Sequence, residues 1–327
     1  MFTSDHLLTS RRSFLKRAGL AGMALPFASA LTASEKSEQK QANQKYPFRI
    51  SINTSTISGF NLPVEEQIKL AASAGFDGIE LWISDLNRFA ETGGNLNDLR
   101  KLMEDSQLRL ENIIAFANWI SNDPQQSASG MEQMKREMTC AAQLGGHHIA
   151  AAGGGLDVFV PENMDMYGRQ FAEINRIGQS LGVTPLLELW GHGTLNKQWK
   201  VMAIAAESRC ASACFLLDFY HLHAGGNSFG SLSLLNGTRL PVFHINDYPG
   251  DIPAENLKDS DRVYPGDGVC PFNEVIPLLY HTGFRGAFSL EIFNVSYWRN
   301  STPRQVLDAG YRKTAEVIDK ALAGISR

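Results

Sequence analysis

Short apolar segments alternate with longer amphipathic segments eight times along residues 47–327, and this alternation limits the folds open to the chain. The apolar segments are continuous, which is typical of strands in a parallel sheet that is covered on both faces. The predicted strands are residues 48–54, 76–82, 109–116, 148–153, 183–190, 213–221, 241–247 and 286–293. The predicted helices are residues 64–74, 96–106, 129–144, 162–181, 195–208, 229–236, 272–281 and 305–323.

Eight strand-then-helix units predict an α/β protein made of a single (β/α)8 barrel over residues 47–327. A weak internal repeat supports this, because AGFDGIEL (74–81) and TGFRGAFSLEI (282–292) share a Gly-Phe-x-Gly entry to an acidic strand end. The alternative is an open, doubly wound sheet. That fold usually has a glycine-rich phosphate turn after its first strand, whereas STISGFN (55–61) follows here.

The N-terminal residues differ in composition from the rest of the chain. Arg11 and Arg12 precede a short apolar run over residues 18–28, and Ala-Ser-Ala at 28–30 offers a small-x-small cleavage site. Residues 1–33 therefore resemble a twin-arginine signal peptide, which implies export by the twin-arginine machinery to the periplasm or another extracytoplasmic location. The alternative is an amphipathic first helix of the fold. Residues 34–46 are polar and lack periodicity, so we predict a flexible linker.

Composition excludes several classes of function. The formal net charge is −4, and no basic patch of the kind that binds nucleic acid is found. After the N-terminal segment no apolar run is long enough to cross a bilayer. The cysteines show no metal-binding spacing, so we expect small buried apolar side chains, and their disulfide status stays open: Cys140, Cys210, Cys214 and Cys270.

Ionisable side chains stand at the ends of several predicted strands: Glu80, Glu188, Asp218, His244 and Glu291. In a closed parallel barrel the carboxyl ends of the strands meet at one rim, where active sites lie. Carboxylates gathered there repel one another unless a cation is present. The sequence therefore predicts a divalent metal, with Mn²⁺ expected and Mg²⁺, Co²⁺ or Zn²⁺ as alternatives. Taken singly, a glutamate near a strand end is more often a solvated rim charge or a helix cap, and a single histidine is usually a hydrogen-bonded core residue.

Five segments resemble the sugar isomerase/epimerase group, which has a xylose-isomerase-like barrel: LLELWGH (186–192), LLDFYHLH (216–223), VFHINDYPG (242–250), DRVYPGDGVCPF (261–272) and FSLEIF (288–293). The resemblance implies four metal ligands, namely Glu188, Asp218, His244 and Glu291. It also implies that His221 contacts the substrate. The ketose 3-epimerase branch has an arginine six residues after the histidine of the seventh strand. This chain has Gly250 there, and Arg262 in the next loop is the candidate replacement.

Isomerisation and epimerisation of sugars both begin with removal of a proton beside a carbonyl, through an enediolate. Glu188 and Glu291 are the predicted acid and base. Further substrate contacts are predicted for Arg262, Glu80, Trp190, His192 and Asp247. Trp82, Phe219 and Tyr220 are predicted either to stack on a sugar face or simply to pack in the core.

The sequence thus predicts an exported, divalent-metal-dependent sugar isomerase or epimerase whose partner is a small unphosphorylated carbohydrate. One alternative is a metal-dependent lyase or hydrolase-type enzyme that cleaves 3-keto-glycosides by β-elimination. Another is a sugar-binding barrel without catalysis. A metal-dependent endonuclease is disfavoured by the negative net charge. The sugar, the carbon attacked and the existence of a homo-oligomer stay open.

Overall fold

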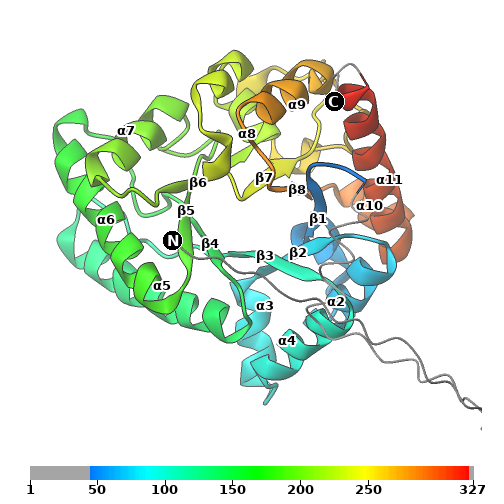
Figure 1. Cartoon of the computed structure of the whole chain (residues 1–327), viewed down its shortest axis with the longest axis horizontal. Coiled ribbons are helices and arrows are strands. Elements are labelled where there is room, and N and C mark those ends of the chain that lie inside the picture. Colours follow the sequence, from blue (N-terminus) through cyan, green and yellow to red (C-terminus); the bar gives the residue numbers. More distant parts are fainter. Residues whose placement is uncertain (1–44, 324–327) are drawn as a thin grey trace, which may run out of the picture.

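The computed structural model describes residues 45–323, which form a closed barrel of eight parallel strands inside a ring of helices (Figure 1). Each strand pairs with the next along the chain, and the last pairs with the first. The strands are β1 (Arg49–Asn53), β2 (Gly78–Trp82), β3 (Arg109–Ile114), β4 (His148–Ala151), β5 (Thr184–Glu188), β6 (Cys214–Asp218), β7 (Val242–Ile245) and β8 (Ala287–Leu290). The predicted fold class is confirmed.

The α-helices cover the outside of the barrel, and the C-terminal helix lies beside β1, where the ring closes (Figure 1). They are α2 (Val64–Ser73), α3 (Ile83–Glu91), α4 (Leu96–Asp105), α5 (Pro124–Gln143), α6 (Met164–Leu181), α7 (Gln198–Ser208), α8 (Phe219–Ala224), α9 (Phe272–His281), α10 (Val295–Asn300) and α11 (Pro303–Leu322). Short 3-10 helices are η1 (Thr54–Phe60), η2 (Pro161–Asn163), η3 (Phe229–Leu234), η4 (Gly237–Arg239), η5 (Ala254–Asn256) and η6 (Asp259–Asp261).

The N-terminal predictions fall largely outside this description. The predicted signal peptide (1–33) and residues 34–44 of the predicted linker lie outside the described residues. Tyr46, the last residue of the predicted linker, is among the described residues and packs against the main core. No helix among residues 45–323 is both long and apolar enough to span a membrane. All four cysteines are free thiols.

Three helices were not predicted, and each begins immediately or shortly after a strand: α3, α8 and α10. The predicted sixth strand (213–221) is wrong at its end, because β6 stops at Asp218. The carboxylate of Asp218 accepts a hydrogen bond of 3.0 Å from the backbone N–H of His221 and so caps α8. Such a cap depends on one side chain and leaves the apolar pattern of the segment unchanged.

Apolar side chains pack on both faces of the sheet, outside and inside the barrel. The main core lies between the sheet and the helices. A second, smaller cluster fills the barrel and consists of Ile114, Ala150, Leu186, Cys214, Leu216 and Val242. Side chains two residues apart on a strand share a face, so Glu188 projects inward directly above Leu186. Asp218 stands in the same way above Leu216, and His244 above Val242. The apolar plug therefore forms the floor beneath a layer of ionisable groups.

A buried ion pair joins strands at the opposite, N-terminal end of the barrel. Glu111 is fully buried and accepts two hydrogen bonds from Arg49, of 2.6 Å from Nε and 2.9 Å from Nη2. Nδ1 of His148 lies 2.9 Å from the backbone oxygen of Glu111, so this nitrogen carries the hydrogen and donates it. Burial is the main cause that lowers the pKa of His148 to about 4. His148 is therefore neutral in the folded protein at pH 7.

We expect His148 to make stability fall in mild acid. The unfolded chain takes up a proton on this ring near pH 6.5, whereas the folded chain does so only near pH 4, so stability is lost as the pH falls between these values. The loss due to His148 from pH 7 to pH 5 should be about 2 kcal/mol. In His148→Asn, whose amide can replace the Nδ1–H donor, that part of the loss should disappear. Urea unfolding of both proteins at the two pH values measures it, and identical pH dependence would contradict the assignment.

Candidate functional site

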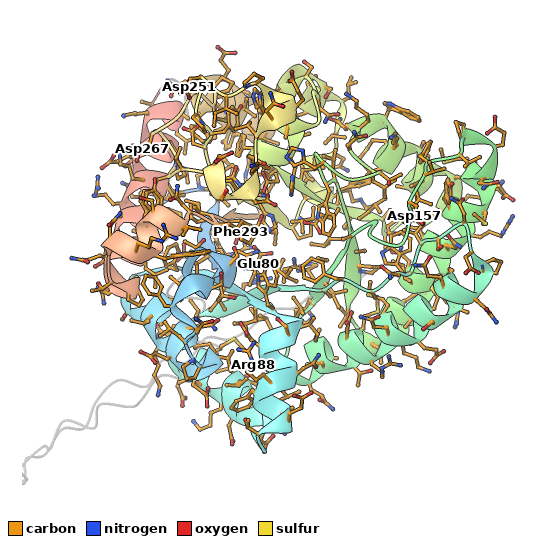
Figure 2. All side chains as sticks on the ribbon, turned by 180° about the vertical axis from the view of Figure 1, so that it is seen from behind. Glu80, Arg88, Asp157, Asp251, Asp267 and Phe293 are labelled. Carbon is orange, nitrogen blue, oxygen red and sulfur yellow. The ribbon has the colours of Figure 1, made fainter. Side chains whose placement is uncertain are left out.

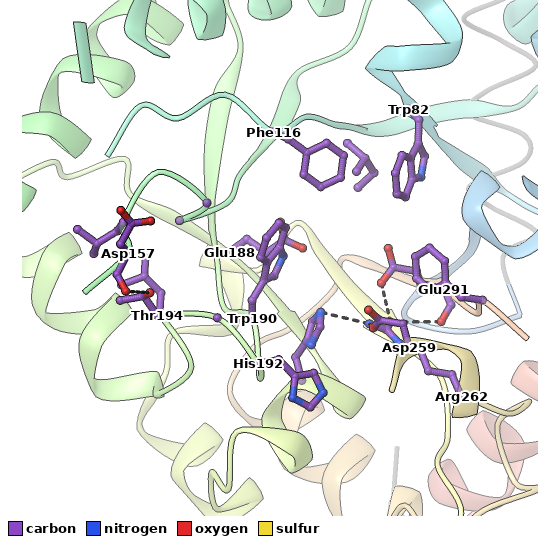
Figure 3. Close-up of a pocket in the computed structure, with 18 residues that line it drawn as sticks. Trp82, Phe116, Asp157, Glu188, Trp190, His192, Thr194, Asp259, Arg262 and Glu291 are labelled. Carbon is purple, nitrogen blue, oxygen red and sulfur yellow. Dashed lines mark hydrogen bonds and ion pairs between the residues drawn. The ribbon is translucent and has the colours of Figure 1, made fainter. Parts of the chain in front are cut away.

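A cavity of about 600 Å³ opens at the C-terminal ends of the strands (Figure 3). Its lining comes from both strand ends and the loops that follow them. Six of the ten side chains that the sequence predicts for the site line this cavity: Glu188, Trp190, His192, His221, Arg262 and Glu291. The other four, Glu80, Asp218, His244 and Asp247, are outside its lining and almost completely buried.

Asp218, His244 and Glu291 form a compact group of potential metal ligands. One ligand atom from each lies within 4.8 Å of the others, and all three residues are buried. Nδ1 of His244 is 3.2 Å from Oε2 of Glu291 and 3.6 Å from Oδ2 of Asp218. The pairing of β6 with β7 sets Asp218 directly beside His244. Two carboxylates and one imidazole at this separation are a donor set that fits a divalent metal ion.

Glu188, the fourth predicted ligand, stands at the end of β5 and faces the same cavity (Figure 3). It is outside the compact group of three. Its Oε2 atom is buried and has no hydrogen-bond partner within the described residues. Burial is the main cause that raises the pKa of Glu188 to about 8. An unpartnered, buried carboxyl oxygen that faces a cavity is available to a ligand or to a reacting proton.

Arg262 extends from the loop after β7 into the mouth of the barrel and is almost fully buried. Its Nη1 donates to Oδ2 of Asp218 (3.0 Å) and to Oε2 of Glu291 (2.7 Å). Its Nη2 donates to Oδ1 of Asp259 (2.6 Å). The guanidinium also lies 4.3 Å from the ring centre of Tyr220. Burial alone would lower the pKa of Arg262, but the nearby carboxylates outweigh it and keep the side chain charged.

The charges of Arg262, His244, Asp218 and Glu291 shift one another's pKa values. Burial acts to raise the pKa values of Asp218 and Glu291. For Asp218, the positive charge of Arg262 is the largest influence that opposes burial, and the pKa is lowered. For Glu291, the positive charge of His244 is the largest such influence, and its pKa is lowered as well. Burial acts to lower the pKa of His244, but the charges of Glu291 and Glu80 raise it well above its ordinary value. The site therefore carries a positive imidazole and a positive guanidinium between ionised carboxylates.

His221 and His192 occupy one wall of the cavity. Nη2 of Arg262 donates to Nε2 of His221 over 3.2 Å. Burial, followed by the charge of Arg262, lowers the pKa of His221 to about 4, so this ring is neutral at pH 7. Nε2 of His192 lies 2.8 Å from the hydroxyl oxygen of Tyr220, and the rest of its ring is exposed at the cavity rim. Both histidines can thus exchange hydrogen bonds with a molecule in the cavity.

Glu80 does not reach the cavity, although the sequence predicts a substrate contact. It is fully buried behind His244, with Oε1 3.1 Å from Nε2 of that ring. Nδ2 of Asn112 donates to Oε2 of Glu80 over 2.9 Å. Figure 2 places Glu80 in the central part of the molecule, away from the outer positions of Arg88 and Asp251. Because Glu80 engages Nε2, it fixes the His244 ring with Nδ1 directed at Asp218 and Glu291.

Asp247 also differs from its predicted role as a substrate contact. It is fully buried, and its two carboxylate oxygens accept hydrogen bonds from four backbone N–H groups. These belong to Tyr248, Gly266, Gly268 and Cys270, at 2.8–3.0 Å. A Cβ on Gly268 would lie 2.2 Å from the backbone oxygen of Tyr248, so only glycine fits there. Asp247 organises the loop that carries Arg262 and has no contact with the cavity.

Two asparagines that the sequence analysis missed complete the polar network. Nδ2 of Asn246 donates to Oδ2 of Asp218 over 3.0 Å, and its Oδ1 accepts from the backbone N–H of Tyr220. Nδ2 of Asn53 donates to Oε1 of Glu291 over 2.9 Å. Asn246 is two residues beyond His244, and Asn53 ends β1, so strand position was the available signal. Asparagine is also common in turns, which hides such roles in a sequence.

We expect Asp247→Asn to lower the free energy of unfolding by about 2 kcal/mol. The new amide keeps one oxygen acceptor but turns an NH₂ group toward backbone N–H donors, which leaves buried donors without partners. Asp267→Asn in the same loop is the matched control, because Asp267 is partly exposed and pairs with Lys313 at the surface. Urea unfolding of the two variants measures the difference. Equal stabilities would show that the four hydrogen bonds contribute little.

Comparisons with known proteins agree with this architecture. The chain is similar to the inosose isomerase of Bacillus subtilis, with 29% identity over 150 residues, 45% of this chain and 53% of that protein. It is similar to the 3-dehydroshikimate dehydratase of Pseudomonas aeruginosa, with 25% identity over 290 residues, 85% of this chain and 43% of that protein. The chain thus spans about half the length of these two relatives.

A third relative is the D-psicose 3-epimerase of Agrobacterium fabrum, with 25% identity over 242 residues, 69% of this chain and 78% of that protein. Among solved structures, the crystal structure of the IOLI protein with a bound zinc atom superposes with a TM-score of 0.77 and 23% identity. The match covers 84% of this chain and 99% of that one, and it shows the same fold.

The family model for the xylose isomerase-like TIM barrel matches residues 68–321, which is most of the chain and includes β2 to β8 together with the cavity-lining residues they carry. The chain therefore belongs to the xylose isomerase-like TIM barrel family.

Proposed function

We propose that this protein is a divalent-metal-dependent isomerase or epimerase of carbohydrates. The observation that carries the proposal is the buried group of Asp218, His244 and Glu291, open on one side to a cavity into which Glu188 also projects. The similarity to an inosose isomerase and to a D-psicose 3-epimerase supports the reaction class. Relatives with different reactions share this fold, so the site and not the barrel has to decide between them.

Asp218, His244 and Glu291 would hold the metal ion, with Glu188 as the fourth ligand. Mn²⁺ remains our expectation, with Mg²⁺, Co²⁺ and Zn²⁺ as alternatives. A bound divalent ion would supply positive charge beside the carbonyl oxygen of the substrate. The donors fit this role because they are buried, close together and of mixed carboxylate and imidazole type. Nη1 of Arg262 pairs with the same oxygens, Oδ2 of Asp218 and Oε2 of Glu291, so metal binding would displace the guanidinium and release the proton from the His244 ring.

The two glutamates can carry out the two proton transfers of the reaction, one that removes a proton and one that returns it. Glu291 is ionised, since its pKa is lowered, and can accept the proton removed beside the carbonyl. The Oε2 atom of Glu188 has no hydrogen-bond partner within the described residues, and Glu188 lines the same cavity, so this carboxylate can pass a proton from solvent to the enediolate. Arg262 and His221 lie on the same cavity wall and can hold the substrate hydroxyls in place.

A second candidate is elimination, because the same proton abstraction leads to cleavage when the neighbouring carbon bears a leaving group. The similarity to a 3-dehydroshikimate dehydratase over 85% of this chain favours it. His192 at the exposed rim of the cavity is the residue that could protonate a departing oxygen. The corresponding substrates would be 3-keto-glycosides.

We propose further that the enzyme acts outside the cytoplasm, on an unphosphorylated sugar. The support is the Arg11-Arg12 motif with the apolar run and the Ala-Ser-Ala site that follow it. The twin-arginine route carries folded proteins, so the metal could be bound before export.

Isotope exchange tests the proposal directly. Protein loaded with each of the four metal ions is incubated in D₂O with a panel of ketoses and 3-keto-glycosides, and the products are analysed by NMR and mass spectrometry. Deuterium at one carbon of an otherwise intact stereoisomer supports the isomerase or epimerase. Two fragments support elimination. The absence of deuterium uptake with every metal and sugar would overturn both.

We expect Glu188→Gln and Glu291→Gln each to reduce the rate of deuterium uptake by roughly 100- to 10,000-fold, because a placed acid or base is lost. Glu274→Gln on the exposed face of α9 is the matched control and should behave like the wild type. Circular dichroism and urea unfolding verify that each variant is folded. Near-wild-type exchange in either site variant would remove that glutamate from the reaction.

We expect Glu80→Gln to weaken Mn²⁺ binding by roughly 10- to 100-fold, since the carboxylate that orients His244 is lost while the volume is kept. Isothermal titration calorimetry with Mn²⁺ alone measures this effect without any turnover. Glu274→Gln again serves as the control. An unchanged Mn²⁺ affinity would show that Glu80 is a packing residue and that His244 needs no orienting partner.

A further inference from the structure

Four aromatic rings form a continuous arc along one side of the cavity: Phe293, Trp82, Phe116 and Trp190. The ring centres of Trp82 and Phe116 are 5.2 Å apart, and those of Phe116 and Trp190 are 5.8 Å apart. Phe293 follows at 6.2 Å from Trp82. The planes of neighbouring rings are tilted by 49° to 73°. Figure 3 shows Trp82 and Phe116 together, with Trp190 nearer to Glu188.

All four rings line the cavity, and Trp82 also packs against the apolar cluster inside the barrel. Phe116 has 41% of its surface exposed, and the three other rings are only partly buried. Trp82 is held in place, because its Nε1 donates to Oδ1 of Asn53 over 2.8 Å. Half-exposed aromatic rings that are held in place beside a cavity can bind the apolar face of a ligand.

Four ionisable groups line the same cavity: Glu188, His221, Arg262 and Glu291. The two ends of the arc approach them, because Arg262 lies 5.2 Å from the ring centre of Phe293 and Trp190 stands near Glu188 (Figure 3). A single hexose occupies roughly 200 Å³ at the packing density of organic solids. The cavity has a volume of about 600 Å³. A sugar that reacts beside the ionisable groups therefore leaves most of the cavity volume free, and a second ring has room next to it.

The outer rim of the aromatic side is polar, which bears on the nature of that second ring. Asp157 and Thr194 stand there, away from Arg262 and Glu291 (Figure 3), and Oγ1 of Thr194 donates to the backbone oxygen of Asp157 over 3.3 Å. Gly153 and Gly154 also line the cavity and bring no side chains into it. A ring with an apolar face for the arc and hydroxyls for the rim matches both surfaces, and a sugar ring has both.

We propose that the aromatic arc is a subsite for a second sugar ring, so that the substrate class is a disaccharide and not a free monosaccharide. This inference rests on the proposed function, which identifies the ring bound beside Glu188 and Glu291 as the reacting sugar. The second ring stacks on Trp190 and Phe116 and directs its outer hydroxyls toward Asp157 and Thr194.

Binding measurements can test the subsite apart from turnover. Isothermal titration calorimetry compares glucose, cellobiose, maltose and phenyl β-glucoside on the Mn²⁺-loaded wild type, Trp190→Ala and Phe116→Ala. Trp199→Ala is the matched control, because Trp199 is exposed on α7 and lies outside the cavity lining. At least one disaccharide should bind the wild type 10-fold or more tightly than glucose does. Phe116→Ala should remove most of that difference and leave glucose binding unchanged. Trp190→Ala should weaken disaccharide binding more than glucose binding, and Trp199→Ala should bind all four ligands like the wild type.

Each outcome bears on a separate claim. If neither disaccharide binds more tightly than glucose, or if the ring variants weaken glucose equally, the subsite is overturned, and the isotope exchange experiment still decides the proposed function. If a disaccharide binds through the arc and no sugar exchanges deuterium, the proposed reaction fails and the subsite stands. If only phenyl β-glucoside gains affinity from the arc, the second ring is an aryl aglycone and the assignment to a sugar is overturned.

Discussion

Repulsion among carboxylates buried at the mouth of the barrel is the constraint on which the rest of the site depends. Asp218 lies above an apolar cluster that offers it no compensation, and both Asp218 and Glu291 are almost fully buried, so their charge has to be met from the sides. Arg262 meets it from the loop after β7, and His244 meets it from the strand between them. The loop can supply Arg262 only because Asp247 binds its backbone. The polar rim of the cavity is thus held together by charge balance as much as by the sheet.

The sequence predicted the barrel well because its signals are periodic. Continuous apolar strands and strand parity bring Glu188, Asp218 and His244 to one rim without any knowledge of contacts. The same reasoning wrongly predicted that Glu80 and Asp247 contact the substrate. Position on a strand shows that a side chain points inward, but it does not show how deeply that side chain is buried. Helix α8 was missed for a related reason, since its start depends on one cap by Asp218 inside an apolar segment. Contacts made by single side chains across loops leave no pattern in the sequence.

Similar proteins with different reactions share this scaffold, and the structure shows where such differences can arise. The ligand-type residues come from the strands, whereas most of the cavity wall comes from the loops that follow them. Arg262 illustrates this division, because it takes a place in the centre from a loop while Gly250, nearer to β7, has no side chain to offer. The ionisable groups therefore stand on rigid strands, whereas the shape of the cavity wall depends on loops, which vary more readily among proteins of one fold.

The amide of Asn53 ties these two parts together. Its oxygen accepts from the indole of Trp82, and its nitrogen donates to Glu291. A carboxamide has one group of each kind, so the two hydrogen bonds hold or break as a pair when the amide turns over. During divergence of the protein, the tryptophan and the glutamate are therefore not free to drift separately. A lineage that changed the aromatic wall at residue 82 would have to re-anchor its acidic partner at the same time.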